Sequence, residues 1–142
     1  MESPSKKIRR SNPHLRLAGA AYFVTWRLRR GQGELQPPER TQVVLTLRHF
    51  KHDRYELLGY VVMDDHVHAI LQPKGDEDLG KIIHSWKSFS ANAFQRMFGR
   101  TGRIWQTSYY DRIVSPEGEL TEKLTYIFNN PFKRWPEIKE YE

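Results

Sequence analysis

The sequence contains no cysteine, which excludes disulfide bonds, thiolate metal ligands and a thiol nucleophile. It also lacks a run of about 18 or more apolar residues, so we expect no membrane-spanning helix. The first residues have no apolar segment of the kind that a secretory leader needs. We therefore expect a cytoplasmic protein, and 142 residues are enough for a single domain with a buried core.

Acidic residues are scarce at the start of the chain. The first 30 residues contain eight lysines and arginines but one acid, Glu2, whereas the remaining 112 residues have a net charge of −1. Low apolar content in residues 1–13 predicts a flexible basic arm, with residues 14–142 as the single domain. A basic arm is typical of proteins that contact a polyanion, and the 13% of aromatic residues would allow base stacking. A solubilising tail is the alternative explanation.

Strand and helix signals alternate along the chain and predict an α+β fold. The last helix is expected to begin with Ser115 as its cap and to end before Pro131, because the residue preceding a proline disfavours helical geometry. The economical arrangement is a ferredoxin-like antiparallel sheet with the helices packed on one face. The predicted strands are residues 20–28, 55–63, 66–72 and 104–114, of which 55–63 and 66–72 are two strands or one long bent one. The predicted helices are 37–51, 79–98 and 115–130.

Two histidines interrupt an apolar strand. His66 and His68 are spaced i, i+2, so both side chains project from the same face of the strand. Two neutral imidazoles side by side form a bidentate clamp for Mn, Fe, Co or Zn. The alternative is a half-buried strand whose histidines are only hydrogen-bonded. The metal hypothesis therefore needs a third ligand and a reactive group from elsewhere in the chain.

The last helix supplies candidates for both. Tyr126 and Asn130 are spaced i, i+4 and share one helix face. The amide oxygen of Asn130 would complete an uncharged three-ligand site that leaves positions open for a phosphate oxygen. Tyr126 is the candidate nucleophile, although a phenol titrates near ~10 and needs nearby cations or the metal to favour the phenolate. A packing tyrosine and a helix-end asparagine are the alternatives.

Four sequence blocks together resemble a known family. The sequence is similar to the IS200/IS605-type single-tyrosine transposases of the HUH superfamily, and within them to the REP-associated tyrosine transposases. The histidine pair alone is a weak signal, whereas four blocks in the family's order are a strong one. The blocks are residues 9–14 with 21–28, residues 61–68 (VVMDDHVH), residues 105–113 (WQTSYYDRI) and residues 126–131 (YIFNNP).

The resemblance implies a ferredoxin-like domain that binds single-stranded DNA folded into a hairpin. It implies cleavage with Mg²⁺ or Mn²⁺ and a 5′-phosphotyrosine intermediate. Matched by position, His66, His68 and Asn130 are the metal ligands and Tyr126 is the nucleophile. The REP-associated branch implies a monomer, whereas related insertion-sequence enzymes are dimers that share active sites. Two alternatives stay open: a domesticated protein that binds hairpins without cutting them, and a hydrolase in which water attacks.

Tyr109 and Tyr110 are rival nucleophiles. Neither pairs at helical spacing with a possible ligand, and Tyr110 is expected to pack or to stack on DNA. The sequence also departs from the family at Asp64, where members often have proline. Asp64 has the strand parity of the two histidines, so it either approaches the metal or faces solvent. Members of the family usually continue past the position of Glu142. Whether a C-terminal segment is missing or trimmed here is a question that stays open.

Several residues outside the catalytic set are candidates for contacts with DNA. Basic side chains near the start of the chain suit the backbone or groove of a hairpin, where they would give salt-dependent affinity. Lys87 could meet the scissile strand or be a solvated helix lysine, and Trp105 could read an unpaired base or belong to the core. The candidates are Arg9, Arg10, His14, Arg16, Lys87, Trp105 and Gln106.

Overall fold

The computed structural model describes residues 16–137 and Tyr141. The predicted arm with Arg9 and Arg10, and also His14, lie outside these residues. The described elements follow the predicted order of strands and helices: β1 (Ala21–Arg27), α2 (Pro37–His49), β2 (Tyr55–Val62), β3 (His66–Pro73), α3 (Leu79–Met97), β4 (Tyr110–Val114) and α4 (Glu119–Arg134). None of the helices within the described residues is both long and apolar enough to cross a membrane.

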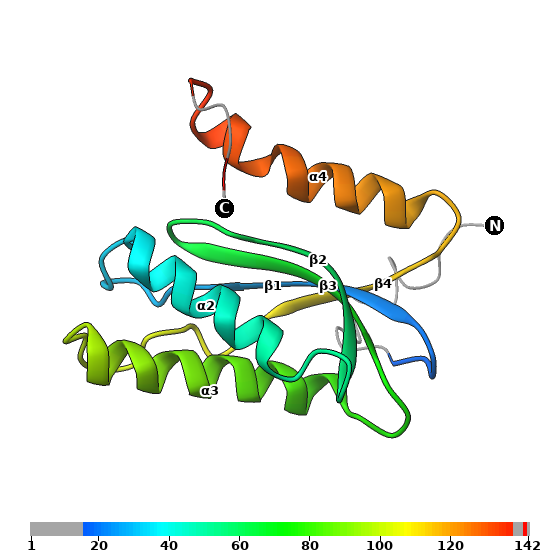
Figure 1. Ribbon diagram of the computed structural model, residues 1–142, viewed down its shortest axis with the longest axis horizontal. Helices are drawn as coiled ribbons and strands as arrows, with labels where there is room; N and C mark the ends of the chain where they lie inside the picture. Colours follow the sequence, from blue (N-terminus) through cyan, green and yellow to red (C-terminus); the bar gives the residue numbers. More distant parts are fainter. Residues whose placement is uncertain (1–15, 138–140, 142) are drawn as a thin grey trace.

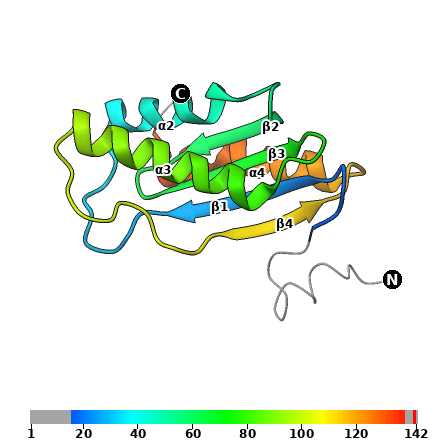
Figure 2. The same cartoon turned by 90° about the horizontal axis from the view of Figure 1, so that it is seen from below.

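The strands form one antiparallel sheet in the order β2-β3-β1-β4 (Figure 2). This order, with α2 and α3 as the two crossovers, is the ferredoxin-like arrangement. The predicted α+β class is therefore confirmed. Strands β3 and β1 lie in the centre of the sheet, so the histidine pair lies on a strand that has neighbours on both sides.

Helices α2 and α3 cover one face of the sheet (Figures 1 and 2). Alternate residues of β1, Tyr22, Val24 and Trp26, point to this face and are almost completely buried. Trp86 of α3 stacks on Trp26 at 5.5 Å between ring centroids and donates a hydrogen bond from Nε1 to the hydroxyl of Tyr55 at 2.9 Å. Large aromatic surfaces that are buried here make this the main hydrophobic core.

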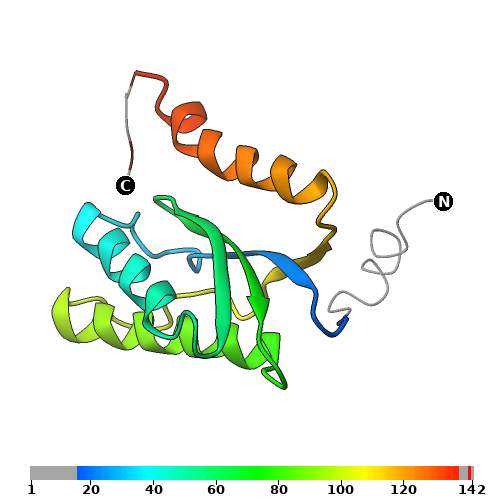
Figure 3. The same ribbon diagram turned by 45° about the vertical axis from the view of Figure 1, so that its right-hand side comes forward.

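Helix α4 lies on the opposite face (Figures 1 and 3). Ile127 packs there in a smaller cluster with Phe23, Ile70 and Val114. The expectation that all helices share one face was therefore wrong for α4. Because the central strands carry apolar residues on both sides, the second side also needs a cover.

Two predicted boundaries also differ. Strand β4 begins at Tyr110, and the preceding segment joins the sheet only through an isolated bridge between Trp105 and Leu28. Helix α4 starts after Gly118, not after Ser115, and continues through Pro131. Pro131 is buried, and its carbonyl accepts the backbone N–H of Trp135 at 2.8 Å. Helical hydrogen bonding therefore resumes after the proline, which removes one donor without ending the helix.

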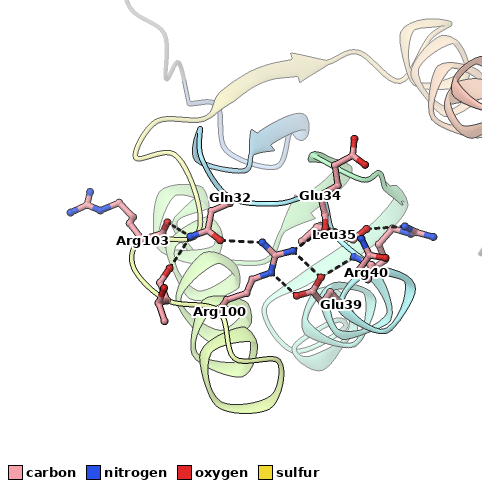
Figure 4. A network of polar contacts seen from close by, with 9 residues as sticks. Gln32, Glu34, Leu35, Glu39, Arg40, Arg100 and Arg103 are labelled. Atoms are coloured by element: carbon pink, nitrogen blue, oxygen red, sulfur yellow. Dashed lines mark hydrogen bonds and ion pairs between the residues drawn. The ribbon is translucent and has the colours of Figure 1, made fainter.

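A network around Arg100 joins the end of α3 to α2 and to the loop that follows β1 (Figure 4). The guanidinium donates to both carboxylate oxygens of Glu39, at 2.5 and 2.9 Å, and to Gln32 Oε1 at 3.1 Å. Its hydrogen bonds lower the pKa of Glu39 below the ordinary value. The same loop donates the N–H of Leu35 to the carbonyl of Asp64 at 2.7 Å. The network therefore holds the loop that supports the turn before β3.

Candidate active site on the α4 face of the sheet

The two histidines lie on the face that α4 covers, because they alternate along β3 with Val67 and Ala69, which belong to the main core. Their ring centroids are 4.7 Å apart with an interplanar angle of 72°. In the sheet register His68 lies opposite Thr25, and His66 lies opposite Arg27. Two imidazoles are thus held side by side on a central strand, as the i, i+2 spacing predicts.

His68 is buried, with 4% of its surface exposed. Its Nδ1 lies 2.7 Å from the hydroxyl of Thr25, whereas Nε2 is buried and has no hydrogen-bond partner among the described residues. Burial, and then the positive charges of His66, Arg27 and Lys123, lower the pKa of His68 to about 3. The ring is therefore neutral at physiological pH, which is the form that binds a metal ion.

His66 is oriented by the residue before it. Its Nδ1 lies 2.6 Å from Asp65 Oδ1, and its side chain is 16% exposed. Burial of Asp65 would raise its pKa, but the hydrogen bond and charge of His66, together with the charge of Arg27, outweigh this, so the pKa of Asp65 is lowered. A carboxylate on one nitrogen and an open second nitrogen is the arrangement commonly found behind a metal-binding histidine.

Helix α4 brings Tyr126 to this pair. Its ring centroid lies 5.4 Å from that of His68 and 6.1 Å from that of Phe23, which itself stacks on His68 at 5.3 Å. Tyr126 is 45% exposed, so its ring is open to a ligand. The ammonium of Lys123 lies 6.0 Å from the Tyr126 centroid. A phenol, a cation and two imidazoles therefore share one region of the sheet.

Asn130 lies one turn after Tyr126 and is half-buried. It stands inside α4 and not at its end, because the helix continues to Arg134. Within the part of the chain that the structure describes, no three His, Asp or Glu side chains come together as a metal-binding group. The unpartnered Nε2 of His68 and the orientation of His66 fit two ligands, so an amide or a substrate oxygen would have to supply the rest.

Asp64 does not face solvent, which was one of the two alternatives for this residue, while its approach to the metal stays a prediction. Its side chain is buried, with 6% of the residue exposed, and accepts a hydrogen bond from Arg134 Nη2 at 2.8 Å. Arg134 also lies 3.7 Å from Glu34. Because Arg134 belongs to the last turn of α4, this ion pair joins the helix that carries Tyr126 to the turn that precedes His66.

The remaining candidates for DNA contacts have local partners. Arg16 donates to Asp111 at 3.0 Å and to the hydroxyl of Tyr109 at 3.2 Å. Lys87 donates to the carbonyl of Thr107 at 3.0 Å, and burial lowers its pKa. Trp105 is 4% exposed and donates from Nε1 to Ser90 Oγ at 2.9 Å, so it belongs to the core, the alternative stated above.

Gln106 is exposed and donates to the carbonyl of Leu28 at 3.2 Å. With Lys87 and the edge of Trp105 it lines a groove of about 530 Å³ between α3 and the segment that leads into β4. The groove lies on the side of the sheet away from Tyr126. A contact between DNA and these residues stays a prediction.

The rival tyrosines lie in different surroundings. Tyr109 is half-buried beside Lys87 and Arg16, and burial raises its pKa. Tyr110 is 45% exposed and lies opposite Thr25 in the sheet register. Tyr110 therefore shares the sheet face of His68, whereas Tyr109 lies on the other side of the strand.

Three residues of the site were not singled out from the sequence: Thr25, Lys123 and Arg134. Thr25 could have been found only from the register between β1 and β3. Lys123 precedes Tyr126 by three positions and so lies on the same helix face, a spacing that the sequence does display. Arg134 lies beyond Pro131, where the helix was expected to have ended.

Fold and site together define a ferredoxin-like domain with a histidine pair on its central strand and a tyrosine on a covering helix. The family model for IS200-like transposases matches residues 36–130. The chain belongs to this family, as the sequence resemblance predicted. The match includes His66, His68, Tyr126 and Asn130.

Individual relatives agree with this assignment. A Haemophilus influenzae protein (strain ATCC 51907 / DSM 11121 / KW20 / Rd) that carries the name REP-associated tyrosine transposase is 23% identical over 96 residues, which span 58% of this chain and 53% of that protein. The chain thus spans about half the length of this curated relative.

Two solved structures share the fold. One is a REP-associated tyrosine transposase bound to a REP hairpin, with a TM-score of 0.71, 24% identity and coverage of 86% of this chain and 72% of that one. The other is described as a transposase from Deinococcus radiodurans, with a TM-score of 0.59, 22% identity and coverage of 82% and 94%. At these identities the likeness establishes the ferredoxin-like architecture.

Proposed function

We propose that the protein cleaves and rejoins single-stranded DNA next to a hairpin through a covalent bond to Tyr126. The observation that carries the proposal is the position of Tyr126 beside His68, whose buried Nε2 has no partner among the described residues. A buried polar atom without a partner is costly, so such an atom next to a half-exposed phenol favours a site that is completed by a ligand. The solved relative bound to a REP hairpin supports hairpin DNA as that ligand.

In the proposed reaction the phenolate oxygen of Tyr126 attacks the scissile phosphorus. A phosphotyrosine bond forms, the bond to the 3′ oxygen breaks, and this oxygen leaves as a hydroxyl after it takes up a proton. The phosphodiester energy is kept in the covalent bond, so a 3′ hydroxyl can later reverse the step. The ammonium of Lys123, 6.0 Å from the Tyr126 ring centroid, would bring a positive charge to the region where the phosphate is attacked.

We further propose that His66, His68 and Asn130 hold a divalent cation, Mg²⁺ or Mn²⁺. Such an ion supplies charge that polarises the scissile phosphate and offsets the negative charge of the transition state. The chain's own part is to fix the ligands. Thr25 orients His68 through Nδ1, and Asp65 orients His66 in the same way.

The proposed site needs one chain only. Tyr126 lies beside His68 of its own sheet, and Ile127, the next residue, is buried against that sheet. A monomer is therefore the expected active form, as the resemblance to the REP-associated branch implies. A homodimer that exchanges α4 is the alternative, and sedimentation of the active protein with a hairpin oligonucleotide distinguishes the two.

The test is a labelled hairpin oligonucleotide with a single-stranded flank, incubated with the protein and Mn²⁺ and run on a denaturing gel. We expect a protein–DNA adduct that is lost in Tyr126→Phe and kept in Tyr110→Phe, the matched control from the same sheet face. Binding without any adduct would indicate a hairpin-binding protein that does not cut. Cleavage that survives Tyr126→Phe would indicate attack by water.

A further inference from the structure

Next to His66 the surface is hollowed where β1 ends. The hollow has a volume of about 270 Å³ and is lined by Arg27, Arg29 and Arg30 together with Asp65 and Gln106, among others. Arg27 lies opposite His66 in the sheet register, and Asp65 holds the ring of His66. The hollow therefore adjoins the proposed active site directly.

The three arginines of the hollow differ from most other arginines of the protein. Within residues 16–137 their guanidinium groups form no hydrogen bond, ion pair or ring contact, and all three residues are exposed. The arginines that do have partners are Arg16, Arg40, Arg54, Arg100, Arg103, Arg112 and Arg134. Two more arginines, Arg48 and Arg96, also have none in this range, but each is the only arginine in the last turn of its helix.

Two carboxylates, Asp65 and Glu34, also line the hollow, so its three arginines and two acids leave a formal net charge of +1. The charge of Arg27 contributes to the lowered pKa of Asp65. Asp65 Oδ1 is engaged with His66, and Glu34 lies 3.7 Å from Arg134. Three like charges within four residues repel one another unless an anion lies between them. A guanidinium presents its donors in a planar fork that matches a phosphate, which makes arginine suited to this ligand.

The backbone of the hollow is held in place. The N–H of Leu28 donates to the carbonyl of Asp65 at 2.9 Å, that of Arg29 to Ile104 at 2.8 Å, and that of Gln106 to Arg27 at 2.9 Å. The side chains are thus free while the main chain that carries them is fixed. Such a platform loses little order when a ligand binds, beyond that of the side chains themselves.

We propose that this hollow, defined by Arg27, Arg29 and Arg30, binds the phosphates of the unpaired strand that adjoins the scissile phosphate. The assignment rests on the proposed function, which places an unpaired strand at His66. The contacts would be to the backbone and not to base edges, so they position the strand without reading its sequence. The hollow thereby sets which phosphate of the flank reaches Tyr126.

The experiment measures binding in a Tyr126→Phe background, so that no chemistry occurs. One ligand is a hairpin with a single-stranded flank and the other is the same hairpin with a blunt stem. The variant is Arg29→Ala with Arg30→Ala, and the matched control is Arg48→Ala with Arg96→Ala, which removes the same charge from arginines that also lack partners. Circular dichroism checks that all three proteins are folded.

For the flanked hairpin we expect the Arg29/Arg30 variant to bind about tenfold more weakly. The slope of log affinity against log salt should become shallower by about 1.4, roughly 0.7 for each lost contact to a single-strand phosphate. The blunt hairpin should bind as it does to the parent, and the Arg48/Arg96 control should change little with either ligand.

Three outcomes would overturn the assignment. An equal loss in the Arg48/Arg96 control would indicate general electrostatic attraction, and an equal loss with the blunt hairpin would indicate contacts to the stem. Unchanged binding of the flanked hairpin would mean that the hollow holds no strand. An adduct formed by the Tyr126 protein alongside any of these results would leave the proposed function standing. If the Arg29/Arg30 variant binds the flanked hairpin more weakly but the Tyr126 protein forms no adduct, the hollow still binds the strand and the proposed cleavage function is contradicted.

Discussion

The two faces of the sheet use the same strands for different purposes. On the face of α2 and α3, the residues of β1 are Tyr22, Val24 and Trp26, which are buried in the main core. On the face of α4, the intervening residues are Phe23, Thr25 and Arg27. Phe23 packs in the smaller apolar cluster, Thr25 orients His68, and Arg27 lines the hollow next to His66. The period of two in a strand thus separates folding from the proposed chemistry.

The helices on the two faces are also attached differently. Helices α2 and α3 are fixed by aromatic packing and by the Arg100 network. Helix α4 is held by a small apolar cluster and by the ion pair of Arg134 with Asp64. A segment with fewer buried apolar contacts opens at a lower free energy than the core. We therefore expect α4, which carries Tyr126, to be the helix that moves most readily.

The largest effect is expected from the main core. Trp86→Ala should lower the free energy of unfolding by roughly 3–5 kcal/mol, because it removes an almost fully buried ring and leaves a cavity. Ile127→Ala on the α4 face should cost about 2 kcal/mol, the lower end for a buried aliphatic residue. Urea denaturation measures both, with Phe128→Ala, 69% exposed, as the control. Equal losses at Trp86 and Ile127 would contradict the difference between the faces.

The next effect concerns the Arg100 network. Glu39→Gln should cost roughly 2–3 kcal/mol at pH 7, because it leaves the buried guanidinium without its carboxylate partner. Arg100 lowers the pKa of Glu39 in the folded state, so its stabilisation is complete above the pKa of an unfolded glutamate, ~4.3, and is lost as the pH falls through the folded-state pKa.

Unfolding measured at several pH values checks this prediction. The difference in stability between the parent and Glu39→Gln should shrink as the pH is lowered below about 4. A variant on the α4 face, Arg134→Gln, serves as the comparison for the size of the effect at pH 7. A difference between the parent and Glu39→Gln that stayed constant down to the acid limit would show that the carboxylate charge does not contribute.

The third effect should appear chiefly in the reaction, with a smaller loss of stability than at Glu39. Arg134→Gln removes the ion pair between α4 and Asp64, so Tyr126 should be less well positioned. We expect the rate of adduct formation in a single turnover to fall about tenfold. This is a smaller loss than the roughly 100-fold that a 1 Å misplacement of a reacting group can cause. Lys133→Gln, an exposed neighbour in the same turn, is the control. Faster hydrogen exchange in α4 should accompany the loss, and an unchanged rate would rule out a positioning role.

The sequence predicted the order of elements well, because period-two and helical patterns report burial directly. It also predicted that His66 and His68 share a face, since this follows from strand geometry alone. Family resemblance then related Tyr126 to that pair across a long stretch of sequence. In the structure the ring centroids of Tyr126 and His68 lie 5.4 Å apart. The roles of these residues as nucleophile and metal ligand stay predictions.

What the sequence did not predict depends on tertiary contacts. Pro131 was expected to end the last helix, but the helix continues through this buried proline, so Arg134 is helical and reaches Asp64. The role of Thr25 depends on the register between β1 and β3, which no local pattern determines. The contacts of Trp105 with Ser90 and Leu28 could not be predicted from the sequence either. The local sequence of an exposed loop and that of a buried bridge to the sheet are similar.

The smallest effect tests how tightly α4 is packed. A methyl group added at Gly59 would lie 2.6 Å from Cδ2 of Leu124, the end of a flexible side chain on α4. Because Leu124 can rotate and α4 can shift, Gly59→Ala should cost no more than about 1 kcal/mol. Ala69→Val enlarges a fully buried residue on the face of α2 and α3 and should cost roughly 1–3 kcal/mol, because that core is closed on all sides. Thermal unfolding of both variants measures the difference, and equal costs would mean that α4 is packed as rigidly as the main core.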